Sequence, residues 1–161
     1  MLIDAGGDAL LSGQTEVTTL EFSNWIHWDN RDELDEIQFP GIYLLAHFDC
    51  VPAGPTYPKD KNIIYNGETC NTLKNRWRQF HRSAFEDKQG HSGGITYREH
   101  QRSKGKILYV AAFPVSEIVY ASLFPENDIE KTRHLFIRFI ERKLLWEYAL
   151  EHGEAPECNR K

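Results

Sequence analysis

The sequence has few cysteines, a single methionine and no long apolar run. Its three cysteines, Cys50, Cys70 and Cys158, are odd in number and far apart, which argues against a disulfide framework and indicates reduced thiols in a cytoplasm. No stretch approaches the roughly 20 apolar residues of a membrane-spanning helix, and the N-terminus lacks the basic segment and apolar core of a signal peptide. We therefore expect a cytoplasmic protein that does not contact a membrane.

The composition is that of a folded globular protein. Of the 161 residues, 40% are hydrophobic and 27% are charged, which argues against disorder. This length is typical of one domain with a sizeable core. Two parts differ in character: residues 1–38 are acidic and are interpreted as an N-terminal extension, whereas residues 39–161 are predicted to form the folded domain.

The charges are unevenly distributed along the chain. The formal net charge is -5, yet residues 74–106 hold nine basic and three acidic residues, whereas residues 1–49 hold one basic and ten acidic residues. A local basic patch is what a polyanion such as DNA requires, whatever the total charge; a solvated basic surface without a ligand is the alternative. The acidic segment is not expected to touch DNA, and it offers a surface for a protein partner.

The pattern of apolar residues predicts an α/β fold of the α+β type: a small three-stranded antiparallel sheet flanked by helices. The strand PGIYLLAHF begins at Pro40, and a proline-rich loop over 49–60 joins it to a second strand over 61–66. The other predicted elements are a short helix around 30–37, helices over 72–84, 95–104 and 128–152, a turn over 87–94 and a third strand over 106–113. The expected N-caps of the two longer helices are Asn71 or Thr72 and Asn127 or Asp128.

The helix predicted over 72–84 has a core face and a basic face. Its core stripe at helical spacing consists of Leu73, Trp77, Phe80 and Ala84. A line of cations pointing away from the core consists of Lys74, Arg78 and Arg82. Arg76 lies at the border of the core stripe, where its stem is packed and its guanidinium is held still. Such an arginine either holds a phosphate with two hydrogen bonds or pairs with a carboxylate at the edge of the core.

The helix predicted over 128–152 carries a carboxylate on its apolar face. The apolar residues that share this face with Glu141 are Ile137, Leu144, Leu145 and Tyr148. A carboxylate in such a stripe is costly unless it is paired or bound to a metal. Glu141 is therefore either the partner of an arginine, Arg76 included, or a metal ligand.

The order of these residues resembles the GIY-YIG nuclease superfamily over about residues 39–160. Gly41-Ile42-Tyr43 is followed by Tyr65-Asn66-Gly67 on the next strand, by Arg76 in the next helix and by Glu141 in a late helix. Two further patterns agree with the family: Gly90-His91-Ser92 is similar to the histidine-bearing turn of its homing-endonuclease branch, and Pro156 to Asn159 is similar to its closing residues. The chain is identified as a small single-domain member of the bacterial or phage type.

The resemblance implies a metal-dependent DNA endonuclease that hydrolyses phosphodiester bonds. Tyr43 is then the general base, Tyr65 orients water, and Arg76 neutralises the scissile phosphate. Glu141 binds one divalent cation, Mg²⁺ or Mn²⁺, and His91 assists Tyr43 in proton transfer. The residues implied to contact DNA are Lys74, Arg76, Arg78, His81, Arg82 and Asn159.

Two residues depart from the family pattern. Asn66 stands where the family has isoleucine or valine, and it is expected on the face of the sheet away from the site. Glu68 stands where many members have lysine or a small residue; it either holds Arg76, shares a metal with Glu141, or weakens cleavage. In the last case the domain only binds DNA or a protein, which is the alternative to an active nuclease.

Other patterns in the sequence are weaker. The cysteines and histidines show no spacing typical of a zinc site. Trp25 and Trp28 favour a small hydrophobic cluster over base stacking. The sequence shows no separate DNA-reading domain, so recognition of a particular DNA site is expected to come from loops such as 49–60 and 86–104.

Overall fold

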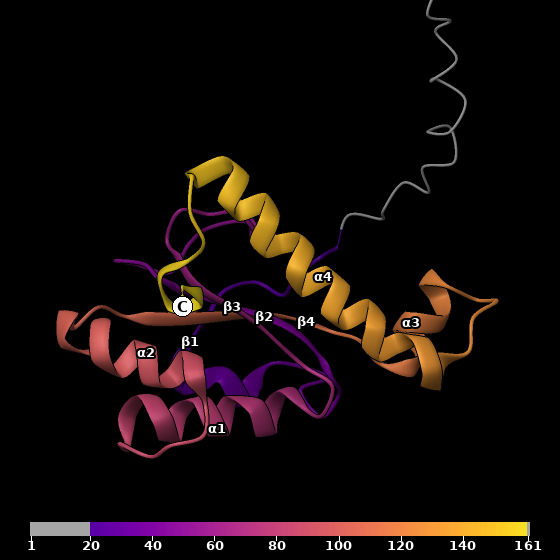
Figure 1. The fold of residues 1–161 in the computed structure, drawn as a ribbon, viewed down its shortest axis with the longest axis horizontal. Helices are drawn as coiled ribbons and strands as arrows, with labels where there is room; N and C mark the ends of the chain where they lie inside the picture. The colour runs from indigo at the N-terminus through magenta and orange to yellow at the C-terminus, as the bar shows by residue number, and fades with distance from the viewer. Residues whose placement is uncertain (1–19, 161) are drawn as a thin grey trace, which may run out of the picture.

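The computed structural model describes residues 20–160, which form a sheet with helices on both faces (Figure 1). Within this range the sheet has four antiparallel strands in the order β1-β4-β2-β3. The strands are β1 (Ile26–His27), β2 (Gly41–His47), β3 (Ile63–Thr69) and β4 (Leu108–Pro114). The predicted mixed fold with an antiparallel sheet is confirmed. The predicted number of three strands is wrong, because β1 has two residues and therefore no alternating pattern that reveals it.

Both faces of β2 are buried because helices cover the two sides of the sheet (Figure 1). Tyr43 and Leu45 belong to the core layer beneath α1 (Leu73–Phe85) and α2 (Ser92–His100). Their neighbours Ile42 and Leu44 belong to the opposite layer, beneath α4 (Ile129–His152), with α3 (Glu117–Leu123) beside it. The two-residue period of a strand produces this alternation, and it directs Tyr43 toward α1 and α2.

Residues 20–38 pack into the same core as the rest of the described chain. Trp28 lies edge-on against Phe80, with 5.2 Å between the ring centroids, and Trp25 is buried in the opposite layer. The two tryptophans therefore belong to opposite layers of the main core, and the predicted small hydrophobic cluster on the extension is wrong. The predicted extension over 1–38 thus contains residues of the core, while its first 19 residues lie outside the described part of the chain.

The helix predicted around 30–37 is wrong. The chain forms a 3-10 helix there, η1 (Trp28–Glu33), and continues in turns. This stretch is acidic, and Leu34 and Ile37 are its only apolar pair at helical spacing, which is too little to bury the face of a longer α-helix. α3 has no counterpart among the predicted elements, since its seven residues are too few for a clear period.

The helices predicted over 72–84 and 128–152 are confirmed as α1 and α4. Thr72 and Asp128 cap them, because each side chain accepts a hydrogen bond from the backbone N–H three residues further on. Gly153 ends α4 in a left-handed conformation with φ 82°. None of the helices between residues 20 and 160 is both long enough and apolar enough to cross a membrane.

The helix predicted over 95–104 begins earlier and ends earlier. It starts at Ser92, ends at His100, and is followed by a 3-10 helix, η2 (Arg102–Lys104). Gly93 and Gly94 concealed its first turn, because glycine has a low helix propensity. Both glycines are required by packing: a Cβ on Gly94 would lie 2.8 Å from the carbonyl oxygen of Phe80 in α1.

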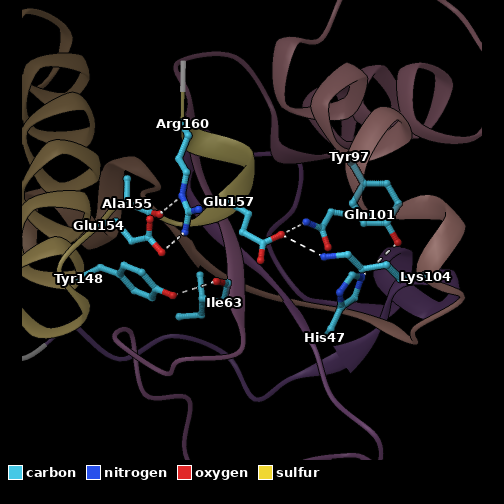
Figure 2. A network of polar contacts seen from close by, with 10 residues as sticks. All are labelled: His47, Ile63, Tyr97, Gln101, Lys104, Tyr148, Glu154, Ala155, Glu157 and Arg160. Atoms are coloured by element: carbon cyan, nitrogen blue, oxygen red, sulfur yellow. Dashed lines mark hydrogen bonds and ion pairs between the residues drawn. The ribbon is translucent and has the colours of Figure 1, made fainter.

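The chain beyond α4 folds back along the edge of the sheet and forms η3 (Glu157–Asn159) (Figure 2). Glu157 accepts hydrogen bonds from Gln101 and from Lys104, and Arg160 pairs with Glu154 at 2.8 Å. These contacts tie the C-terminal segment to the α2–η2 region. They hold Asn159 beside β3, the edge strand that carries Tyr65.

Candidate active site

Two glycines make room for the two tyrosines at the centre of the site. Gly67 is the cross-strand partner of Tyr43, and a Cβ on Gly67 would lie 2.6 Å from the Tyr43 ring and 2.7 Å from its hydroxyl oxygen. Gly93 meets Tyr65 in the same way, since a Cβ there would lie 2.5 Å from that ring. The Tyr-x-Gly spacing on β3 therefore has a steric reason: a side chain at position 67 would displace both rings.

His91 fixes the direction of a hydrogen-bond chain through the tyrosines. Its Nδ1 accepts the backbone N–H of Gly94 at 3.1 Å and so caps α2. Burial, with the charge of Arg76 added to it, lowers the pKa of His91 to about 3. The ring is therefore neutral and carries its one proton on Nε2, which donates to Tyr43 Oη over 3.1 Å. Consequently His91 cannot accept the proton of Tyr43 in this arrangement; it stabilises negative charge there instead.

Tyr65 is the tyrosine that faces the cavity of the site. The exposed fraction is 0% for Tyr43 and 7% for Tyr65, and of the two only Tyr65 lines the cavity. The hydroxyls of the two tyrosines are close enough for each residue to shift the pKa of the other. Because Tyr43 accepts from His91, its own O–H is free to donate to Tyr65. The proton of Tyr65 is then left to point toward the cavity.

Both phenols are neutral near pH 7. Burial raises the pKa of Tyr43 well above its ordinary value and also raises the pKa of Tyr65. The guanidinium of Arg76 opposes this rise in both residues, and the hydrogen bond from Tyr43 opposes it further in Tyr65. Negative charge on Tyr65 would thus be met by Arg76 and the Tyr43 O–H, and negative charge on Tyr43 by Arg76 and the His91 N–H.

Arg76 has no carboxylate partner among residues 20–160. Its Nη1 lies 3.5 Å from Gln79 Oε1, and its buried Nε has no hydrogen-bond partner. Burial opposes its charge, but the hydroxyls of Tyr43 and Tyr65 outweigh burial and raise the pKa of Arg76. A half-buried guanidinium without a counter-ion is suited to an anion from solution, phosphate above all.

The alternative of an Arg76–Glu141 ion pair is wrong. Glu141 pairs instead with its neighbour Arg142, with 3.4 Å between Oε2 and Nε. Glu141 also keeps 12% of its side chain exposed, because it lines a cavity rather than the closed core. Burial raises the pKa of Glu141; Arg142 lowers it, and the charge of Glu68 raises it.

The cavity has a volume of about 230 Å³ and lies between β3, α1, α2, α4 and the C-terminal segment. Its lining combines cations, carboxylates and hydroxyls, and consists of Tyr65, Glu68, Arg76, Ser92, Thr96, Glu141, Arg142, Leu145, Cys158, Asn159 and Arg160. The structure thus brings together Tyr65, Arg76 and Glu141, with Tyr43 and His91 directly behind Tyr65. These five residues stand on four different elements and on the loop before α2, so only the folded chain assembles them.

The donor set fits a hard divalent cation. Glu68 and Glu141 supply two carboxylates to one cavity, and their mutual repulsion is what such a cation relieves. Within residues 20–160, no three histidine, cysteine, aspartate or glutamate side chains are grouped as a metal site. Two oxygen ligands completed by water suit Mg²⁺ or Mn²⁺, since Mg²⁺ keeps several waters in protein sites. They do not suit the nitrogen and sulfur preference of zinc.

The cations predicted on the outer face of α1 do not line this cavity. Lys74 and Arg78 are each two residues from Arg76, so they project about 160° away from it around the helix. Both are exposed, as is Arg82. His81 accepts a hydrogen bond from Trp28 Nε1 at 3.2 Å, so it faces the N-terminal segment. The predicted DNA contacts of these four residues therefore form a surface separate from the cavity.

Other cations, which the sequence did not single out, lie beside the cavity instead. Arg142 and Arg160 line it directly. Arg138 lines an adjacent hollow of about 300 Å³ together with Arg76 and Glu68. Their signal in the sequence is weak, because Arg138 and Arg142 are four residues apart on a helix whose charges are mixed.

Asn66 lies on the face of the sheet away from the tyrosines, as expected. Its Nδ2 donates to the carbonyl oxygen of Glu141 at 3.4 Å, and its buried Oδ1 has no partner in the described part of the chain. Asn159 lines the cavity, but its amide is engaged by the backbone of Asn66 at both ends. Its side chain thus has a structural role at β3, and a DNA contact for Asn159 remains a prediction.

Comparisons with known proteins provide no support for or against a family assignment. No protein-family model, no curated protein and no solved structure matches the chain. The resemblance to the GIY-YIG superfamily therefore remains a prediction that rests on the motifs and on their arrangement.

Proposed function

We propose that the protein is a metal-dependent phosphodiesterase that cleaves DNA at the cavity beside Tyr65. The observation that carries this proposal is the uncompensated guanidinium of Arg76, placed in one cavity with a tyrosine hydroxyl and two carboxylates. A phosphate diester is the substrate that needs all three: a cation for its charge, a base for the attacking water and ligands for a divalent cation.

Arg76 is the residue proposed to hold the scissile phosphate. Its side chain is half-buried, lines the cavity together with Tyr65 and interacts with both tyrosines, so a phosphate held there lies near the Tyr65 hydroxyl. Charge that develops on the phosphate oxygens in the transition state is then met by a fixed cation that needs no reorganisation. Arg142 and Arg160 on the cavity lining are proposed to contact neighbouring phosphates.

Tyr65 is proposed to deprotonate the attacking water, with Tyr43 and His91 as supporting donors. This reverses the roles that the family resemblance implies, because Tyr43 is fully buried and does not reach the cavity. Loss of the Tyr65 proton leaves an anion that accepts from Tyr43 and faces Arg76. His91 Nε2 donates to the Tyr43 hydroxyl, whose own O–H is free to donate to Tyr65, so no side chain has to turn when Tyr65 loses its proton.

Glu141 and Glu68 are the residues proposed to hold the cation. When it is bound, Mg²⁺ or Mn²⁺ supplies positive charge at the phosphate oxygens and at the leaving group. Glu141 is held in place by its position on α4 above β3, and Asn66 bonds to its backbone carbonyl. Glu68, on the same face of β3 as Asn66, then acts as a second ligand rather than as a partner of Arg76.

A plasmid-nicking assay with Mg²⁺ or Mn²⁺, with and without chelator, tests the activity. Glu141→Gln keeps the size of the side chain but removes its charge, so cleavage should fall at least about 1,000-fold while DNA affinity changes little. Mn²⁺ binding followed by electron paramagnetic resonance should weaken in Glu141→Gln and, to a smaller degree, in Glu68→Gln. Cleavage that survives chelation, or a fully active Glu141→Gln protein, would refute the proposal.

The second candidate is a domain that binds DNA without cutting it. Glu68 favours this candidate, because its carboxylate lines the cavity where a phosphate has to enter. Wild-type protein that binds DNA in a salt-dependent manner and shows no nicking, combined with cleavage gained in Glu68→Lys, would establish it. An active wild type that Glu68→Lys inactivates would exclude it.

A further inference from the structure

The outer face of α4 carries four large apolar side chains that nothing in the described chain covers. They are Leu135, Phe139, Trp146 and Leu150, with exposed fractions of 63%, 57%, 61% and 67%. The buried residues of the same helix, Ile137, Ile140, Leu144 and Tyr148, lie on the opposite side. At about 100° per residue, the four exposed side chains fall within about 60° of one another and form a single stripe.

The stripe has a two-fold symmetric spacing. Phe139 and Trp146 are equally far from the helix midpoint between Arg142 and Lys143, and so are Leu135 and Leu150. A second α4 laid antiparallel across this midpoint therefore places each Phe139 against a Trp146 and each Leu135 against a Leu150. Such self-complementarity is what a closed two-fold interface requires, because the same patch has to serve both copies.

The charges at the midpoint do not oppose this contact. Arg142 pairs with Glu141, and Lys143 pairs with Glu147, within the same chain. Both cations project to the sides of the stripe rather than along it, at about 50° from its centre. The two-fold axis places these cations near their counterparts in the second copy, and the carboxylates of Glu141 and Glu147 offset the repulsion between them.

The exposed apolar area is also sufficient for a dimer. The four side chains offer roughly 500 Å² per copy, near the upper limit for the largest apolar patch of an ordinary monomer. Two copies then bury roughly 1,000 Å² through the stripe alone, which is the lower bound for a specific interface. Neighbouring side chains on α4 add to this area.

We propose that the protein forms a two-fold symmetric dimer through antiparallel packing of the outer face of α4. The inference is independent of the proposed nuclease activity. It leaves the cavity open, because Glu141 lies on the side of α4 opposite the stripe, about 160° from Phe139 around the helix. Each copy presents its own cavity, so a dimer holds two.

Analytical ultracentrifugation over a range of protein concentrations tests the dimer. The double variant Phe139→Ser/Trp146→Ser should raise the dimer dissociation constant at least about 100-fold, since central aromatic side chains dominate such interfaces. The matched control is Ile118→Ser on α3, which removes a residue that is 83% exposed but lies outside the stripe; it should leave the dimer unchanged. Circular dichroism and thermal melting confirm that each variant is folded.

Cross-linking tests the register. In a Cys50→Ser/Cys70→Ser background, a mixture of Leu135→Cys and Leu150→Cys proteins should form a disulfide-linked pair, whereas each protein alone should not. A wild type that stays monomeric at every concentration overturns the proposal, as do vesicle binding by such a monomer, larger open-ended assemblies, or linkage of Leu135→Cys to itself.

Discussion

The side-chain amide of Asn159 forms two hydrogen bonds to the backbone of Asn66: its Oδ1 accepts from the N–H and its Nδ2 donates to the C=O, each at 2.8 Å. β3 is an edge strand, so without Asn159 the backbone N–H and C=O of Asn66 would be unpaired. The amide thus takes the place of one residue of a neighbouring strand. It also holds β3 at the residue between Tyr65 and Gly67.

We expect Asn159→Asp to destabilise the protein by about 1–3 kcal/mol. An aspartate can accept from the Asn66 N–H but cannot donate to its C=O, and a charged oxygen is left against the carbonyl. The free energy of unfolding by urea measures the loss. The comparison is Asn66→Val, which removes both the buried Oδ1 that has no partner among residues 20–160 and the bond from Nδ2 to the Glu141 carbonyl oxygen. It should cost less than Asn159→Asp; a larger loss would contradict this view of the Asn66 side chain.

Gly67→Ala is expected to abolish cleavage while the chain stays folded. The new Cβ would lie 2.6 Å from the rings of both Tyr43 and Tyr65, so the rings must move. A shift of about 1 Å in positioned groups costs catalysis on the order of 100-fold. Nicking rates and thermal melting of the variant separate the two effects. Normal cleavage by Gly67→Ala would disprove the steric role.

Tyr65→Phe should reduce cleavage more than Tyr43→Phe. The first change removes the hydroxyl that faces the cavity, and the second removes only a donor behind it. The pKa of Tyr65 is raised, so the residue stays mostly protonated at neutral pH. As long as the pH is below this pKa, each increase of one pH unit raises the phenolate fraction tenfold, and the wild-type rate should therefore rise between about pH 7 and 9. Rates measured across this range, with Tyr43→Phe keeping the rise and Tyr65→Phe losing it, check the assignment; the opposite ranking would restore Tyr43 as the base.

Acid should destabilise the protein through His91. Its pKa is about 3 in the folded state against an ordinary value of 6.5, so the unfolded chain binds more protons between these values. Stability from the neutral ring is therefore complete above about pH 6.5 and is lost as the pH falls toward 3. His47, whose burial lowers its pKa to about 4, adds a loss of the same sign.

Two substitutions at His91 separate its two bonds. His91→Asn keeps an acceptor for the Gly94 N–H and loses the donor to Tyr43, so it should retain stability, flatten the acid slope and reduce cleavage. His91→Gln keeps a donor near Tyr43 and loses the cap, so it should retain more activity and cost about 1 kcal/mol. Urea unfolding at several pH values, with nicking rates at pH 8, measures both. Equal effects from the two variants would contradict this division.

Arginines on α4 should contribute more to DNA binding than arginines on the outer face of α1. Arg138→Ala and Arg142→Ala should each reduce the slope of log affinity against log salt by about one unit, since each removes a phosphate contact. Arg78→Ala and Arg82→Ala serve as matched controls of equal charge, expected to change the slope by less than half as much. Fluorescence anisotropy at several salt concentrations measures this; larger effects on α1 would relocate the DNA.

The sequence predicts the parts of the site that repeat with the period of an element. The core stripe of α1 placed Arg76 at its border, and the apolar face of α4 placed Glu141 among buried neighbours; both placements agree with the structure. The Tyr-x-Gly spacing predicted which residues of β3 share a face. Element existence and residue orientation thus follow from local pattern.

Relations between distant segments could not be predicted in this way. That Asn159 bonds to Asn66, or that Glu141 pairs with Arg142 rather than with Arg76, depends on how the C-terminal segment and α4 cross β3. Which nitrogen of His91 carries the proton depends on its hydrogen bond from the Gly94 N–H. The sequence did not predict this bond, because Gly93 and Gly94 made the first turn of α2 unrecognisable as helix. β1 was missed because two residues carry no period.

The tyrosine pair and the long connecting loop lie at different ends of the β2–β3 hairpin. Tyr43 lies near the start of β2 and Gly67 near the end of β3, whereas the connection over 49–60 leaves from the opposite end of both strands. Residues 49–51 are exposed there. The exposed start of the loop therefore tolerates an insertion: a fluorescent tag or a sequence-specific binding module inserted at residue 50 would leave the tyrosine pair in place.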